Sequence, residues 1–127
     1  MLIACTGVVL AFGGGCQGRD AKAMAVVERE LALLAPPPGI APADPRVGVG
    51  EMYAEGTQTY CVADEKGGQV ALDSMLRKAG WQPVSTSTTA DATIWRYGKD
   101  QGLGSLVLES QPQHCGRRFR VEVAEPL

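Results

Sequence analysis

The fold is decided by residues 92–123, which read ATIWRYGKDQGLGSLVLESQPQHCGRRFRVEV. This stretch holds three runs rich in β-branched, aromatic and other apolar residues, at 92–98, 103–110 and 117–123. The first two runs are joined by the short polar segment Lys99-Asp100-Gln101-Gly102, which predicts a hairpin. We therefore expect the three runs to pair as antiparallel strands.

The last of these runs indicates that the sheet has one buried face and one solvent-exposed face. Its apolar residues alternate with charged ones, so that successive side chains point to opposite faces of the strand. The apolar positions are Phe119, Val121 and Val123, and the charged positions are Arg118, Arg120 and Glu122. Such alternation is typical of an antiparallel sheet that packs on a core with one face only.

Two helices and one more strand are predicted upstream. A helix is expected over residues 20–35 with Asp20 as its N-cap, because apolar residues recur there at spacings of three and four. A second helix is expected over 69–79, opened by Gly67-Gly68, and Gly80 follows it as a left-handed C-cap. Residues 58–63 alternate as a strand.

The order of these elements predicts an α+β fold. We expect a two-layer domain in which an antiparallel sheet of about four strands is covered on one face by one or two helices. Residues 20–127 would form this single domain, and residues 36–50 would be a proline-rich connector within it. Val47 and Val49 permit a short edge strand in that connector.

The composition fits one small globular domain. The chain has 127 residues, of which 45% are hydrophobic and 20% are charged, and this mix is too apolar for a disordered chain. The formal net charge is −2 at pH 7 and the isoelectric point is about 5.3. No nucleic-acid partner is expected, because the chain lacks the excess positive charge that such binding needs.

The N-terminus is expected to be a signal peptide, residues 1–15, followed by a lipid-anchored tether, residues 16–19. Residues 1–12 carry no charge, and as a helix they would span about 18 Å, less than the ~30 Å hydrocarbon core of a bilayer. Cys16 stands where this apolar run meets polar sequence. The boundary resembles a bacterial lipobox, where signal peptidase II cuts and the cysteine thiol carries diacylglycerol.

Other interpretations of the N-terminus stay open. Gly13 stands where a lipobox usually has leucine, and no basic segment precedes the apolar run, which is explained if the true start lies upstream. Ordinary secretion would instead cut after Ala11-Phe12-Gly13. A third possibility is an uncleaved anchor or a buried apolar strand.

The four cysteines support the lipoprotein interpretation. Cys5 would leave with the signal peptide and Cys16 would carry the lipid, so that Cys61 and Cys115 remain. In an oxidising compartment, an isolated pair in a small domain is most simply one disulfide. The alternative is two unpaired buried thiols in a cytosolic protein.

Three further motifs resemble motifs of small secreted lipoproteins of GC-rich bacteria. They are the helix end LRKAGW at 76–81, a Pro-Pro-Gly connector at 37–39 and the aromatic-basic strand WRYGK at 95–99. The resemblance covers roughly residues 20–125. It implies an envelope location and this kind of fold, and it implies no assigned activity.

No catalytic residue, metal site or cofactor is expected. His114 and Cys115 are adjacent, but successive side chains of an extended chain face opposite ways, and an oxidised Cys115 has no nucleophilic thiolate. Together with Cys61 they could supply three zinc ligands only if the disulfide were absent. The acidic pairs are read as solvated charge, with Asp64-Glu65 in a turn and Glu28/Glu30 on a helix exterior.

Two groups of side chains are candidates for a partner-binding surface. Arg118 and Arg120, with Arg117, form the only basic cluster, and Arg96 joins it if the strands are neighbours; such a face could receive a lipid headgroup or a wall polymer. The alternative that we favour is an exposed sheet edge, where charges block edge-to-edge aggregation. Trp81, Trp95 and Tyr97 could form a surface on which a sugar stacks. We instead expect these aromatic side chains to pack in or near the core.

The hypothesis from sequence is therefore a non-enzymatic lipoprotein of the bacterial cell envelope. Its extracytoplasmic domain would be anchored to a membrane by lipid and would bind an envelope protein or a cell-wall component. The alternatives are a secreted soluble form and a small secreted hydrolase or enzyme inhibitor. A deep pocket holding two carboxylates would favour the hydrolase.

Overall fold

A six-stranded antiparallel sheet forms one layer of the molecule. The computed structural model describes residues 15–100, 104–113 and 116–127. The strand order is β1-β2-β6-β5-β4-β3, so that β2, β6, β5 and β4 are internal and β1 and β3 are the edges. The strands are β1 (Pro42–Val49), β2 (Tyr53–Val62), β3 (Gln82–Thr88), β4 (Thr93–Gly98), β5 (Ser105–Gln113) and β6 (Gly116–Pro126).

The α+β class and the antiparallel sheet are confirmed, but the sheet has six strands instead of about four. The four expected runs became β2, β4, β5 and β6. The additional strands are the two edges: β1 lies in the proline-rich connector, and β3 is a Ser/Thr-rich strand whose residues are all exposed. An edge strand tolerates proline because one side of its backbone needs no ladder partner. Neither strand buries a face, so neither carries an alternating pattern.

Helix α1 (Gly15–Ala32) covers β2. It begins earlier than expected, so Asp20 is not its N-cap; Asp20 lies within the helix and is buried. The residues expected to form a tether, 16–19, belong to the helix as well. A Cβ on Gly56 of β2 would lie 2.5 Å from Val27 Cγ1 and 2.7 Å from Leu31 Cδ1. Glycine at this position therefore lets the helix approach the sheet closely.

Helix α2 (Glu65–Lys78) also starts earlier than Gly67-Gly68. Its N-cap is Asp64, whose Oδ2 accepts a hydrogen bond from the Gly67 N–H at 2.6 Å, because a carboxylate satisfies a donor that the first turn leaves free. Its end is as predicted: Gly80 has φ +98°, and the Trp81 N–H donates to the Leu76 carbonyl at 3.0 Å.

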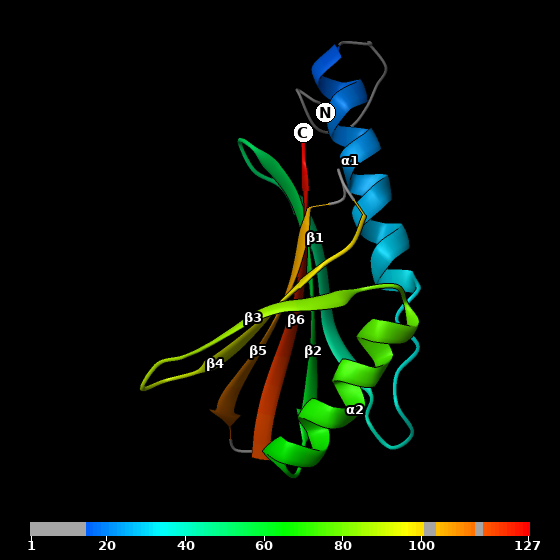
Figure 1. Ribbon diagram of the computed structural model, residues 1–127. Coiled ribbons are helices and arrows are strands. Elements are labelled where there is room, and N and C mark those ends of the chain that lie inside the picture. The colour runs from blue at the N-terminus through cyan, green and yellow to red at the C-terminus, as the bar shows by residue number, and fades with distance from the viewer. Residues whose placement is uncertain (1–14, 101–103, 114–115) are drawn as a thin grey trace.

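Both helices lie on the same face of the sheet, which we call the inner face (Figure 1). The alternation predicted for the last run is confirmed, since Phe119, Val121 and Val123 are fully buried there. Leu72 and Leu76 of α2 and the aromatic side chains of Trp81, Tyr60 and Tyr97 complete the core. The opposite, outer face has no helix over it in the part of the chain described.

The domain has two distinct ends (Figure 1). The first turn of α1, the β1–β2 turn and the C-terminus lie at one end, which we call the α1 end. The first turn of α2, the end of β2 and the start of β6 lie at the other, the α2 end. These two ends set the positions of the surfaces described next.

Candidate functional site

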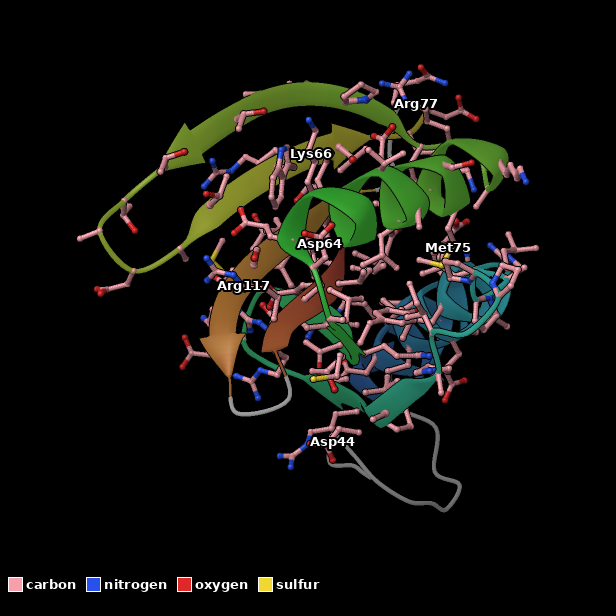
Figure 2. All side chains as sticks on the ribbon, turned by 90° about the horizontal axis from the view of Figure 1, so that it is seen from below. Asp44, Asp64, Lys66, Met75, Arg77 and Arg117 are labelled. Carbon is pink, nitrogen blue, oxygen red and sulfur yellow. The ribbon has the colours of Figure 1, made fainter. Side chains whose placement is uncertain are left out.

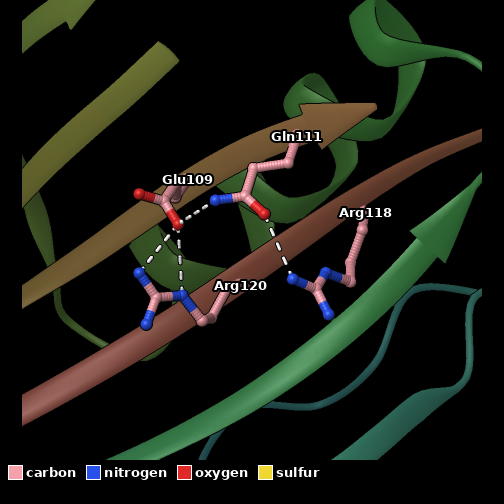
Figure 3. A network of polar contacts seen from close by, with 4 residues as sticks. All are labelled: Glu109, Gln111, Arg118 and Arg120. Carbon is pink, nitrogen blue, oxygen red and sulfur yellow. Dashed lines mark hydrogen bonds and ion pairs between the residues drawn. The ribbon is translucent and has the colours of Figure 1, made fainter. Parts of the chain in front are cut away.

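A polar network bridges β5 and β6 on the outer face (Figure 3). Glu109 Oε1 accepts hydrogen bonds from Arg120, at 2.7 Å from Nη2 and 3.2 Å from Nε, and from Gln111 Nε2 at 2.9 Å. Gln111 Oε1 in turn accepts from Arg118 Nη2 at 3.1 Å. We call these four residues the outer-face network. Both of its arginines are therefore held by neighbours on the adjacent strand.

The structure does not gather the basic residues into one cluster. Arg96 lies on β4, separated by β5 from Arg118 and Arg120 on β6, so these strands are not neighbours. Arg117 points to the inner face and pairs with Glu65. The alternative of an exposed sheet edge is wrong, because β6 is an internal strand and its charges cannot protect an edge.

A polar recess of about 270 Å³ opens at the α2 end. Its walls come from the first residue of α2, the β3–β4 turn, the start of β4, β5 and the start of β6. It is lined by Glu65, Thr89, Ala90, Asp91, Ala92, Thr93, Ser110 and Arg117. Figure 2 views this end of the domain, with Asp64, Lys66 and Arg117 around the start of α2. We call this feature the α2-end recess.

The recess contains one ion pair and one buried hydroxyl without a hydrogen-bond partner. Arg117 Nη2 lies 2.9 Å from Glu65 Oε1, and both side chains are 37% exposed. Ser110 is only 3% exposed, and its Oγ has no hydrogen-bond partner. A buried hydroxyl without a partner is unfavourable by roughly 1–3 kcal/mol. Among the buried side-chain polar atoms of the recess, Ser110 Oγ is therefore the one without a hydrogen-bond partner.

The β3–β4 turn gives the recess an ordered wall. Thr89 Oγ1 accepts hydrogen bonds from the backbone N–H groups of Asp91, at 3.2 Å, and Ala92, at 3.1 Å. The Thr89 N–H donates to the Ala92 carbonyl at 2.8 Å. A threonine that satisfies its own turn in this way fixes the backbone locally.

Sequence reasoning did not identify the recess. Ser110 is the last residue of the predicted run 103–110, and register places it opposite Phe119 on the inner face. A serine that takes an inward position in an alternating strand is a usable signal. Glu65 is distant in sequence from Ser110 and Arg117, so only the tertiary structure brings it beside them.

Only some of the cysteines named in the predictions lie among the described residues. Cys61 lies on the outer face of β2 and is disulfide-bonded. Cys115 and His114 lie outside the described residues, so the pairing of Cys61 with Cys115 stays a prediction. Cys16 belongs to the first turn of α1, and its lipidation stays a prediction too.

Glu30 does not lie on the helix exterior as expected. It is 4% exposed, and its Oε1 accepts a hydrogen bond from Lys99 Nζ at 2.6 Å. The same ammonium lies 5.4 Å from the centroid of the Trp81 ring, a distance at which a cation is attracted to the aromatic face. Burial, with the neighbouring Glu30 charge, raises the pKa of Glu125, whereas Arg29 opposes this rise.

The other expected positions are partly corrected. Asp64 is a helix cap and Glu65 is helical, so this acidic pair does not form a free turn. The aromatic residues are packed as predicted: Trp81 and Tyr97 are buried, and Trp95 stacks on Phe119 with centroids 6.0 Å apart. Tyr97 donates to Asp73 Oδ1 at 2.6 Å. Burial raises the pKa of Tyr60 to about 12.

Among the described residues, no group of three or more His, Cys, Asp or Glu side chains is placed to hold a metal ion. No helix in this part of the chain is both long and apolar enough to cross a membrane. Comparison with known protein families, curated proteins and solved structures gives no match.

Proposed function

We propose that this chain is a non-enzymatic domain of the bacterial cell envelope, held to a membrane by lipid on Cys16, that binds an envelope protein or a cell-wall component. One observation carries this proposal. Cys16 lies in the first turn of α1, and the α2-end recess lies at the opposite end of the domain (Figure 1). A lipid at the α1 end would leave the recess facing away from the membrane.

The recess supports binding better than the predicted arginine face does. Arg118 and Arg120 already donate to Gln111 and Glu109, so an anionic partner would have to displace these bonds. Arg96 is exposed but stands apart from them. The recess instead offers a buried hydroxyl whose Oγ has no partner, that of Ser110.

The anchor is tested by mass spectrometry of the membrane fraction from an expressing bacterium. We expect a chain that begins at Cys16 and carries lipid, and a Cys16→Ser variant that is released from the membrane. Without reductant, Cys61 and Cys115 should be joined. An intact chain in the cytosol, with Met1 retained, would contradict the proposal.

The binding surface is tested by capture of envelope components on the immobilised full chain. We expect Arg117→Ala to reduce capture strongly, whereas the double variant Arg118→Ala/Arg120→Ala should change it little. The opposite result would assign binding to the outer face. Equal capture by all three proteins would remove both surfaces.

A hydrolase is the second candidate, because the recess holds two acidic residues, Glu65 and Asp91. Hydrolysis of a glycoside needs one carboxyl to be protonated while the other is charged. Arg117 Nη2 already lies 2.9 Å from Glu65 Oε1. Incubation with wall glycan distinguishes the two functions: release of fragments that Glu65→Gln abolishes would establish the hydrolase, and an unchanged glycan supports binding alone.

A further inference from the structure

We infer that the α2-end recess binds one neutral sugar unit through the Ser110 hydroxyl and the Arg117–Glu65 pair. This inference rests on the proposed binding function and specifies the chemistry of the cell-wall component. It draws on three independent features of the recess: its size, its charge and its unpaired hydroxyl.

The size of the recess restricts the ligand to a small group. Its volume is about 270 Å³, slightly below the roughly 300 Å³ at which pockets for drug-sized ligands begin. One ring of a saccharide, or a fragment of comparable size, fits this space better than an extended segment. Adjoining sugar units would then lie in solvent outside the recess.

The enclosed charges of the recess favour a ligand without charge. Arg117 and Glu65 neutralise each other across 2.9 Å, so a charged ligand that bound to either of them would have to separate the pair. The remaining charge of the lining, that of Asp91, is exposed to water. A hydroxyl group avoids this, because it can donate to a remaining lone pair of Glu65 and accept from a remaining N–H of Arg117. Asp91 lies at the rim as a further acceptor.

The Ser110 hydroxyl supplies the specificity for hydroxyl groups. Its Oγ is buried and unpaired, and such groups in native structures call for a partner. A hydroxyl both donates and accepts, so it matches a sugar hydroxyl in either direction. Ser110 is flanked by Thr93 on β4 in the sheet register, and Thr93 also lines the recess.

The inference is tested by titrating the full chain with four monosaccharides while its amide NMR signals are recorded. The probes are glucose and N-acetylglucosamine, which are neutral, and glucuronate and glucosamine, which have the same ring with a negative or a positive charge. We expect saturable shifts centred on residues 89–93 and 117 with the neutral sugars, and weaker or no saturable shifts with the charged ones.

Two serines of β5 provide matched variants. Ser110→Ala should weaken binding of the neutral sugars about tenfold, the loss expected for one hydrogen bond of about 1.4 kcal/mol. It should not lower the midpoint of thermal unfolding, because it removes an unpaired buried group. Ser105→Ala, on the exposed outer face of the same strand, should leave binding unchanged.

Three outcomes would overturn the inference. They are the absence of saturable shifts with any neutral sugar, tighter binding of glucuronate or glucosamine than of glucose, and equal binding by Ser110→Ala and the original chain. A chain that fails in this way but still captures an envelope protein and carries lipid on Cys16 would leave the proposed function standing.

Discussion

Two ion pairs of nearly equal length lie on opposite faces of the sheet. Lys99 Nζ and Glu30 Oε1 are 2.6 Å apart on the inner face, where their side chains are 14% and 5% exposed. Arg120 Nη2 and Glu109 Oε1 are 2.7 Å apart on the outer face, where the corresponding values are 36% and 13%. The distances are alike, so the difference between the pairs lies in their surroundings.

The surroundings decide how much each pair matters to folding. The inner pair joins α1 to the segment that follows β4, and Trp81 covers the ammonium group. The outer pair joins β5 and β6, whose backbones are already paired along the whole of β5. Removing one partner from a buried pair leaves an uncompensated charge, whereas water can replace a partner at the surface.

The largest effect is expected from breaking the inner pair. Lys99→Ala should lower the free energy of unfolding by about 3–5 kcal/mol, because Glu30 would remain buried without its partner. Urea denaturation measures this loss. The double variant Glu30→Leu/Lys99→Met should recover much of it, since no charge is then left buried. A loss in Lys99→Ala below that of an outer-face variant would contradict the comparison.

A smaller effect is expected from filling the close contact between α1 and the inner face. Gly56→Ala should destabilise the fold by about 1–3 kcal/mol, since the new methyl group would press on Val27 and Leu31. Gly48 is the matched control, because a Cβ there meets no atom within 4 Å. Equal thermal midpoints for Gly56→Ala and Gly48→Ala would show that the contact is not tight.

Glu125 allows the inner face to be probed by pH. Burial raises its pKa, so the folded state holds this proton more strongly than the unfolded state does. Its contribution favours folding at acidic pH and is lost as pH rises through the folded-state pKa. Glu125→Gln should therefore stabilise the chain more at pH 7.5 than at about pH 4 in urea titrations. The same shift in Glu122→Gln, on the outer face, would refute this assignment.

The smallest effect is expected from the outer pair. Arg120→Ala should lower the free energy of unfolding by only about 0.2–1 kcal/mol, because water can replace the partly exposed Arg120 and Gln111 still donates to Glu109. High salt should reduce even this difference, because screening acts on exposed charges. A loss comparable to that of Lys99→Ala, measured by the same urea titration, would mean that the outer-face network is part of what holds the sheet together.

The elements with one buried face were predictable from the sequence, and the edges were not. Phe119, Val121 and Val123 alternate with charges, and this period of two fixed both the strand and its inner face. The edge strands β1 and β3 have backbones that pair on one side only and almost no buried side chains. These two strands form because an adjacent strand hydrogen-bonds to their backbones, and no local sequence pattern indicates such pairing.

The site was less predictable than the fold because it is assembled from separate elements. Glu30 looks like an ordinary helix charge until Lys99 lies beside it. Arg117 looks like a member of a basic run, but alternation turns it to the face opposite its neighbour Arg118. Because side chains two residues apart in a strand share a face, the sequence alone separates Arg117 from Arg118 and Arg120.

The position of Cys16 inside the first turn of α1 has a mechanical consequence. A lipid on that residue would enter the bilayer at the N-terminus of a helix that packs on the sheet. No flexible linker would separate the lipid from the folded domain. The domain would then keep a fixed distance from the membrane and a fixed orientation, instead of moving freely around its attachment point. The α2-end recess would then meet partners only in a thin layer about one domain length from the bilayer. Inserting a few flexible residues after Cys16 would widen that layer.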